Sequence, residues 1–302
     1  MDLTVIFNQV LILFIILLAG FGANKLKLLT GEVCKKLSGF IMMVTMPAII
    51  IHSAQIEFTR DKLENTLWVL GMAMGSFVIS ILIVEVLFRK LPGEKRAVFK
   101  FAGVFSNCGY MGFPVLYGVF GEIGIFYGAV FLIPFNLFLW TYGVLIYSRE
   151  KNFKKMMKDM LNPSIIALFF GILSIIFGIR LKTPVYDAVK MLGELTTPLS
   201  MLVIGGTLAL SKMREVVLNA SAYLISLLRL AVIPLLCLVL FRLLGPPEIA
   251  LAITILLVAM PAAAATTIFA QQYEGDAKTA ASVVSVSTLL SMASIPLIMS
   301  LL

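Results

Sequence analysis

Two short segments inside long apolar stretches contain the residues whose types and spacing could bind a ligand. The first reads Ser106-Asn107-Cys108-Gly109-Tyr110-Met111-Gly112-Phe113-Pro114, and the second reads Met260-Pro261, four alanines and Thr266-Thr267. Proline removes a backbone N–H and clashes with the preceding turn, while glycine tolerates dihedral angles that a helix does not use. Each segment is therefore predicted to break a helix, with simple kinking as the alternative. A broken helix exposes unpaired N–H groups at its N-terminal end, and such ends attract anions.

The polar side chains of these segments suit a carboxylate ligand. Asn107 offers donors and an acceptor, so it could hold a carboxylate without carrying a charge. Its alternative role is a hydrogen bond between helices, worth about 1 kcal/mol. Thr266 and Thr267 could donate hydroxyl groups to the same ligand, or they could be small residues that pack where two helices cross.

A second pair of motifs could line the other side of such a site. These are Thr45-Met46-Pro47 and Thr196-Thr197-Pro198, each near the middle of an apolar stretch. The hydroxyls of Thr45 and Thr197 could face the ligand, or they could bond to a carbonyl of their own helix.

Arg229 lies deep inside an apolar stretch, in the run Leu227-Leu228-Arg229-Leu230-Ala231. A charged group there is costly and usually faces a partner or a cavity. Three roles remain open at this point: balancing an anionic ligand, pairing with Glu194, or snorkelling toward an interface.

Three further polar residues are weaker candidates. Glu85 precedes Arg89 by four residues, which predicts a surface ion pair and leaves a protonatable coupling role as the alternative. Asn136, two residues after Pro134, could support the helix breaks or make a structural hydrogen bond. His52, the only histidine, is expected at a membrane interface rather than in a site.

The composition places all these residues in a membrane protein. Of the 302 residues, 60% are hydrophobic and 13% are charged, and the mean hydropathy is +1.03. Soluble domains have about 45–50% apolar and roughly 25% charged residues. This composition excludes a soluble enzyme, a nucleic-acid-binding domain, a disulfide-rich secreted scaffold and any large domain outside the membrane.

Cysteine and histidine usage argues against metal and nucleophilic sites. The three cysteines, Cys34, Cys108 and Cys237, lie far apart in apolar surroundings and are expected to be small buried hydrophobes. One histidine cannot build a His-rich metal centre, and the chain contains no HExxH, GxSxG or phosphate-binding glycine-rich motif. We therefore expect no metal and no cofactor.

Ten apolar segments are each long enough to cross a bilayer, which takes about 20 residues in a helix. Backbone groups in lipid must bond internally, so these segments are predicted to be helices in an all-α polytopic fold. The ten segments are 3–23, 37–54, 67–88, 98–120, 123–147, 163–179, 185–210, 216–244, 248–270 and 277–302.

The basic residues divide the chain and orient it. The polar loop 149–162 separates residues 1–148 from residues 163–302, with five predicted spans on each side. Seventeen of the 24 Lys and Arg residues fall on the face of this loop and six on the other face. Because basic loops stay in the cytoplasm, both termini are predicted outside and Lys154 and Lys155 inside.

Five spans in each half imply that any repeat is inverted. The motifs agree with this, since the Thr-Pro motifs fall in the second and seventh spans and the helix-breaking segments in the fourth and ninth. Interrupted helices at matching places in inverted halves are the sequence signature of a transporter's substrate site.

At these residues the chain resembles the auxin efflux carrier family, which includes plant PIN-type carriers and bacterial permeases for malate or malonate. Asn107 to Pro114, followed by Gly118, is similar to the family pattern Asn-x-x-x-Met-Gly-x-Pro-x-x-x-Gly. Further similarity covers Phe40 to Pro47, Leu192 to Ala209, Pro261 to Ala270 and Tyr273. Plant carriers have a second proline where this chain has Thr266 and a long central loop that this chain lacks, so a bacterial relative is favoured.

The resemblance implies the fold of bile-acid sodium symporters and sodium/proton antiporters. Spans 1, 2, 6 and 7 would form a scaffold that forms a homodimer, and spans 3–5 and 8–10 a transport domain. Discontinuous helices 4 and 9 would cross at mid-membrane, where the substrate binds and moves by an elevator-like shift. The candidate substrate-binding residues are Thr45, Pro47, Asn107, Cys108, Gly109, Gly112, Pro114, Thr197, Pro198, Arg229, Pro261, Thr266 and Thr267, and the coupling candidates are Glu85 and Asn136.

The expected function is secondary active transport of a small organic anion, such as a carboxylate, across the plasma membrane. A proton or sodium ion is the expected coupling partner, and no nucleic acid is expected. Alternatives are a sodium-coupled organic-anion symporter of the same fold, a channel, and an intramembrane enzyme, for which no nucleophile–base pair is recognisable.

Overall fold

The computed structural model describes residues 3–56, 59–91, 93–147, 162–210, 216 and 218–302. Its elements are helices, joined at one place by an isolated β-bridge. Lys154, Lys155 and nearly all of the predicted basic loop lie outside the described residues.

The α-helices are α1 (Leu3–Lys25), α2 (Gly31–Phe40), α3 (Met46–Ser53), α4 (Arg60–Leu87), α5 (Gly93–Val104), α6 (Phe113–Phe138), α7 (Val144–Tyr147), α9 (Pro163–Ile176), α10 (Val185–Glu194), α11 (Thr196–Leu210), α13 (Ala220–Leu227), α14 (Ile233–Arg242), α15 (Glu248–Val258), α16 (Ala265–Gln272) and α17 (Ala277–Met299). Four π-helical turns are η1 (Ile41–Thr45), η2 (Cys108–Gly112), η3 (Leu139–Gly143) and η4 (Leu228–Val232).

Seven helical segments of the described chain are long and apolar enough to cross a membrane. Two further apolar helices, α9 and α15, have only 14 and 11 residues. The side chains that face outward agree with lipid contact: Leu82, Val86 and Leu243 expose 61%, 70% and 79% of their surface. Apolar exposure of this kind, spread over many helices, marks a membrane-facing surface.

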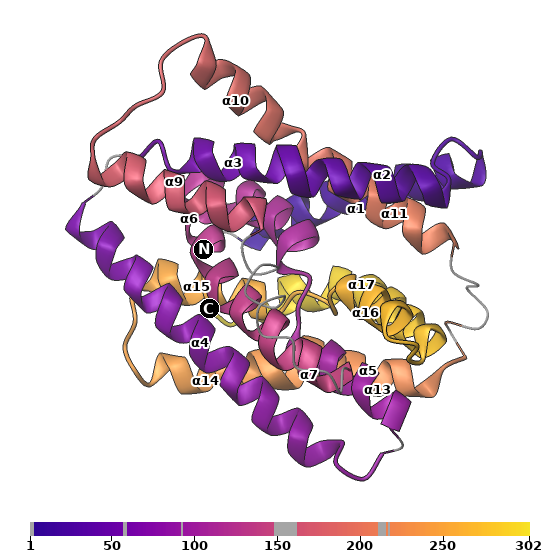
Figure 1. Ribbon diagram of the computed structural model, residues 1–302. Helices are drawn as coiled ribbons and strands as arrows, with labels where there is room; N and C mark the ends of the chain where they lie inside the picture. The colour runs from indigo at the N-terminus through magenta and orange to yellow at the C-terminus, as the bar shows by residue number, and fades with distance from the viewer. Residues whose placement is uncertain (1–2, 57–58, 92, 148–161, 211–215, 217) are drawn as a thin grey trace.

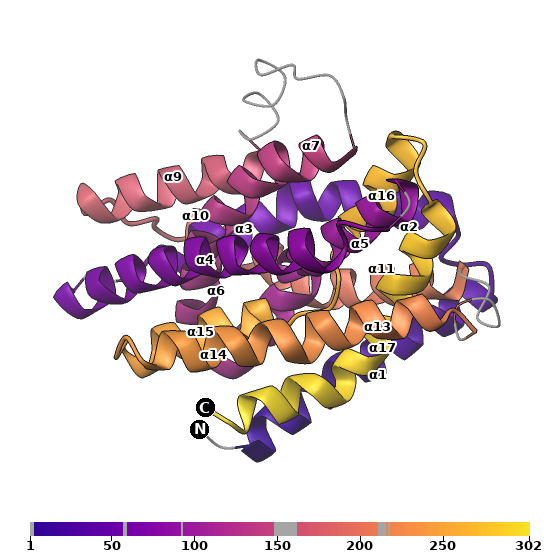
Figure 2. The ribbon, with the colours of Figure 1, turned by 90° about the horizontal axis from the view of Figure 1, so that it is seen from below.

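Proline explains where the long helices change their winding. Pro47, Pro114 and Pro234 each stand in the first turn of an α-helix, and each of these helices directly follows a π-helical turn. A proline cannot donate the backbone bond that a continuous α-helix needs, and a π-turn widens the helix around that gap. The rods α2–η1–α3 and α13–η4–α14 therefore stay continuous, as Figures 1 and 2 show.

Gly121 divides the long segment between Cys108 and Tyr147. Its φ of 62° and ψ of −146° are not helical, and glycine adopts them without a Cβ clash. The predicted boundary between the fourth and fifth spans falls at this residue, so α6 contains the end of one predicted span and most of the next.

Helices α1 and α11 form a close pair, seen one beside the other in Figure 1. Glycines make this approach possible, because a Cβ on Gly20 would overlap the Leu202 carbonyl and a Cβ on Gly205 would overlap the Leu17 carbonyl. Small residues at a helix interface let two backbones approach closely, and in lipid such packing drives association.

The Gly205→Ala substitution should lower the melting temperature of the purified protein. The new methyl group meets backbone rather than a flexible side chain, so we expect a cost near the upper end of the roughly 1–3 kcal/mol typical of overpacking. Gly22→Ala in α1 is the control, since a Cβ there meets nothing within 4 Å. Equal melting temperatures for the two variants would contradict the close approach of α1 and α11.

Candidate functional site

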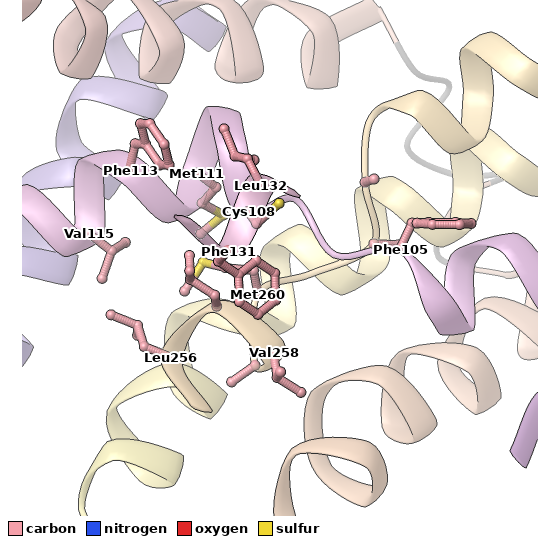
Figure 3. Packing of buried hydrophobic residues seen from close by; sticks show 14 of the residues in the cluster. Phe105, Cys108, Met111, Phe113, Val115, Phe131, Leu132, Leu256, Val258 and Met260 are labelled. Carbon is pink, nitrogen blue, oxygen red and sulfur yellow. The ribbon is translucent and has the colours of Figure 1, made fainter. Parts of the chain in front are cut away.

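The two predicted helix breaks meet each other. Residues between α5 and η2 and residues between α15 and α16 form an antiparallel bridge at Ser106 and Ala262. The Asn107 N–H donates to the Pro261 carbonyl at 2.7 Å, and the Ala263 N–H donates to the Phe105 carbonyl at 2.9 Å. Two segments about 155 residues apart in sequence are thus held together by backbone bonds. Figure 3 shows the non-helical chain after Phe105 passing beside the chain at Met260, enclosed by apolar side chains.

Four helix ends converge on this bridge. Helices α5 and α15 end there, whereas η2 and α16 begin there. Helix α5 contacts α16, and α15 contacts η2, so the arriving helix of each segment packs against the departing helix of the other. The C-terminal ends carry partial negative charge and the N-terminal ends partial positive charge. We call this arrangement the crossing.

Arg229 binds the two C-terminal ends at the crossing. It belongs to η4, is 1% exposed, and is the largest fully buried side chain of the described residues. Its Nη1 donates to the carbonyls of Gly103 (3.0 Å) and Val104 (3.3 Å) at the end of α5. Its Nε donates to the Met260 carbonyl (3.2 Å) and its Nη2 to the Val258 carbonyl, at the end of α15.

These bonds bear on two of the three roles considered for Arg229 from the sequence, and balancing an anionic ligand stays a prediction. Snorkelling is wrong because the side chain is buried, and an ion pair with Glu194 is not found among the described residues. The last carbonyls of a helix have no partner within it, and a cation there is favoured by the helix dipole. Arg229 therefore joins two broken helices by satisfying both of their ends.

The Asn107 side chain, unlike that of Arg229, makes no hydrogen bond to the described residues of the crossing. The residue is 4% exposed, and its carboxamide makes no hydrogen bond with any described residue, although its backbone bonds are satisfied. Asn107 is the N-cap of η2, with φ −77° and ψ 52°, and its carbonyl accepts from the N–H groups of Met111 and Gly112. The carboxamide therefore keeps its donors and its acceptor available beside the N-terminus of η2.

Buried hydroxyls without a partner lie in the helices around Asn107. Within the described part of the chain, the hydroxyl oxygens of Thr45, Thr196, Thr254 and Thr266 are buried and unbonded. Thr45 and Thr266 were sequence candidates. In the motif Thr196-Thr197-Pro198, the fully buried threonine is Thr196, whereas Thr197 and Pro198 are half-buried. Thr267 is also half-buried. Thr254 was missed because a threonine between isoleucines in an apolar run gives no sequence signal.

Helices of the predicted scaffold contact the glycine-rich segment. The Tyr110 hydroxyl donates to the Ser38 carbonyl at 3.1 Å, and a Cβ on Gly109 would lie 3.4 Å from Cε of Met46, next to Thr45 and Pro47. Helix α11 contacts both η1 and η2. The Thr45–Pro47 motif and helix α11, which begins at Thr196, thus contact the glycine-rich segment. The bridge brings the segment after Met260 to the same place.

Three further candidates from the sequence, Cys108, Gly112 and Pro114, lie in tightly packed surroundings. Cys108 and Pro114 are buried, and a Cβ on Gly112 would come within 2.7 Å of Cδ2 of Leu257, which keeps η2 close to α15. All three cysteines, Cys34, Cys108 and Cys237, are free and buried, which confirms that they act as small hydrophobes.

The expected Glu85–Arg89 pair is wrong. Glu85 instead pairs with Lys100 (Nζ to Oε2, 2.5 Å) and accepts a hydrogen bond from the Tyr142 hydroxyl at 2.7 Å. Helix α4 ends at Leu87, so Arg89 lies beyond the helical face on which the spacing rule operates. Lys100 was not singled out from the sequence, although a lysine inside a predicted span was a usable signal.

Asn136 makes the structural hydrogen bonds that were one of its two expected roles, and His52 is buried. The Asn136 amide donates to the Leu132 carbonyl (2.8 Å), and its oxygen accepts from Asn162 (2.6 Å), the N-cap of α9, so it secures that helix rather than the crossing. His52 is 4% exposed. Its Nε2 lies 3.0 Å from the Tyr186 hydroxyl and 3.6 Å from Glu122.

The apolar helices of membrane length define a polytopic membrane protein. A family model described as membrane transport protein matches residues 5–299, and the chain belongs to this family. The match confirms the resemblance to auxin efflux carriers seen in the sequence.

Two curated relatives match nearly end to end. The chain is 26% identical to an uncharacterized transporter of Methanocaldococcus jannaschii, covering 94% of this chain and 95% of the relative. It is also 26% identical to an uncharacterized transporter of Methanothermobacter thermautotrophicus, covering 96% of each. The family and these relatives are membrane transporters, not enzymes.

Proposed function

We propose that this chain is a secondary transporter that carries a small organic anion, such as a carboxylate, across the plasma membrane. The observation that carries the proposal is the buried Asn107 carboxamide, which has no partner among the described residues and lies at the N-terminal end of η2 beside the crossing. An amide binds a carboxylate through its N–H groups, and the adjacent helix N-terminus favours the negative charge.

Alternating access would follow from two groups of helices. In the proposed elevator, α1, α2–η1–α3, α9 and α10–α11 form the scaffold, and the remaining helices form the transport domain. Contacts within the first group, between α1 and α11 and between α3 and both α9 and α10, support it as one unit. Contacts of α4 with α6 and α15, and of α17 with α13 and α16, support the second.

The orientation in the membrane and the dimer surface are proposed from the sequence. The basic asymmetry supports external termini and a cytoplasmic central loop in a ten-span, inverted-repeat arrangement. Labelling of a cysteine at position 155 by an impermeant reagent in intact cells would contradict that orientation. The scaffold helices are the proposed homodimer surface, and a single elution species of monomer mass in mild detergent would argue against it.

Counterflow in proteoliposomes tests the transport function. Mono- and dicarboxylates that raise the melting temperature are chosen first, and the best is loaded unlabelled inside vesicles. A carrier should then accumulate the labelled anion transiently above its equilibrium level, because exchange outruns net efflux. A channel gives no such overshoot and an enzyme converts the compound, so either result would refute the proposal. Repeating the assay with and without sodium separates the sodium-coupled alternative.

A further inference from the structure

A pocket of about 490 Å³ lies between the last turn of α4, α5 and the η3–α7 segment. Its polar lining comes from Glu85, Arg96, Lys100 and Tyr142, and its apolar lining includes Leu145 and Ile146. Lys100 stands four residues before the end of α5, which at 1.5 Å per residue is about 6 Å along the helix axis. The pocket is thus a separate cavity, roughly one helical turn from the crossing.

The charges of this pocket do not balance. Lys100 and Arg96 contribute two positive charges and Glu85 one negative charge, which leaves an excess of one positive charge. The Lys100 side chain is only 13% exposed, so it is largely withdrawn from water, and its partner Glu85 is 44% exposed. Arg96 is exposed, and its Nη1 donates a long bond of 3.4 Å to the Arg89 carbonyl.

Glu85 already shows how a carboxylate is held here. One of its oxygens accepts from Lys100 at 2.5 Å and the other from Tyr142 at 2.7 Å. Such charge-assisted bonds are the strong ones. The cations on α5 lie at positions 96 and 100, an i,i+4 spacing that puts both on one face of the helix. A second carboxylate between them would neutralise the pocket.

From this geometry we infer that the pocket is a second carboxylate-binding site, distinct from the crossing, which takes a small monocarboxylate through Lys100 and Arg96. The excess of one positive charge sets the preference for a monoanion, and Leu145 and Ile146 cover its aliphatic part. Because the pocket adjoins α5, it acts as a staging site for an anion that enters or leaves the crossing. This role rests on the proposed function, whereas the binding itself does not.

Saturation binding of radiolabelled butyrate to the purified full-length protein tests the inference. All measurements use the Asn107→Ala background, in which binding at the crossing is weakened, so that the pocket accounts for most of the remaining binding. Lys100→Gln should weaken the remaining butyrate binding at least tenfold. Glu85→Gln should strengthen it roughly tenfold, the effect of freeing one charge-assisted bond on Lys100. Lys90→Gln is the control, because it removes an exposed cation that does not line the pocket.

Competition by malonate measures whether the net charge of the pocket decides between a monoanion and a dianion. With Glu85 present the pocket should prefer butyrate, and Glu85→Gln should shift the preference toward the dianion malonate, because the excess positive charge rises to two. A purely structural Glu85–Lys100 pair would lower the melting temperature in both single variants and leave the butyrate-to-malonate ratio unchanged. That result overturns the inference, as does a lack of butyrate binding in the Asn107→Ala background.

The two proposals fail in different ways. If Lys100→Gln leaves butyrate binding intact while wild-type protein shows counterflow, the staging site is refuted and the transport function stands. If the pocket variants behave as expected but counterflow is absent, the transport function is refuted and the pocket remains. If Lys100→Gln does not fold, the single variant Glu85→Gln still decides the question through its gain in butyrate affinity and its shift toward malonate.

Discussion

Replacing Arg229 by glutamine should leave little folded protein. For Arg229→Lys we expect a folded fraction between those of the glutamine variant and the wild type. The guanidinium donates to four carbonyls at the ends of α5 and α15, and the site is 1% exposed. A buried acceptor left without a partner costs about 1–3 kcal/mol. Several such losses together approach the roughly 5–15 kcal/mol that holds a typical protein folded.

The order of the two variants follows from geometry. Lysine keeps the charge that both helix dipoles favour, but its three N–H donors sit on a single nitrogen atom. The planar guanidinium of arginine has donors on three nitrogen atoms and so reaches both helix ends at once. Glutamine keeps only one donor group and no charge. The melting temperature should therefore fall in the order Arg229, Lys, Gln.

Melting curves and elution profiles of the detergent-solubilised protein measure this expectation. Arg242→Gln is the matched control, because Arg242 lies in α14 of the same rod and donates to the exposed carbonyls of Leu301 and Leu302. If Arg229→Gln keeps the wild-type melting temperature and loses affinity for the transported anion, Arg229 is a direct ligand and its role as a clamp is refuted.

The helix breaks were accessible from the sequence because their cause is local. Pro114, Pro261 and the glycines of the first motif prevent regular winding wherever they occur, and the interruptions appear at residues 105–107 and 259–264. The turn at Gly121 has the same kind of origin, since its φ of 62° requires glycine. Backbone chemistry within a few residues was sufficient for these features.

The partners of the charged residues were not accessible, because they come from distant parts of the chain. Arg229 bonds residues 29 to 126 positions away, and the spacing of a single helix says nothing of them. The assumed Glu85–Arg89 pair failed for a structural reason: Phe88, at φ −104° and ψ 11°, ends α4 before Arg89 is reached. Lys100 takes that place from the next helix, 15 residues along the chain.

Helix lengths explain why the ten predicted segments and the seven membrane-length helices differ. A helix broken at the bilayer centre has halves of about 10 residues, each too short to span the membrane alone. Helix α15, with 11 residues, has the length of such a half. Between Cys108 and Tyr147, one apolar stretch of 40 residues is counted once, although the non-helical turn at Gly121 divides it at the boundary between two predicted segments.

Asn107→Ala should strongly weaken substrate binding at the crossing and leave the fold intact. The Asn107 carboxamide has no partner among the described residues, so its removal breaks no internal hydrogen bond, and the bridge to Pro261 uses only backbone atoms. We expect the free energy of unfolding to change by less than the roughly 1–3 kcal/mol that an unpaired buried hydrogen-bonding group costs. A hydrogen bond to a charged ligand is worth about 1.5–3 kcal/mol, so affinity should fall by roughly 10- to 150-fold.

Asn136→Ala is the matched control with the opposite pattern. It is also a buried asparagine, 8% exposed, but its amide donates to Leu132 and its oxygen accepts from Asn162. Its replacement should lower the melting temperature and leave the affinity of the folded fraction unchanged. Binding and melting measured on both variants, with the anion chosen by counterflow, separate a ligand-binding amide from a structural one. If Asn107→Ala melts early and the surviving protein binds with wild-type affinity, Asn107 is not part of the site.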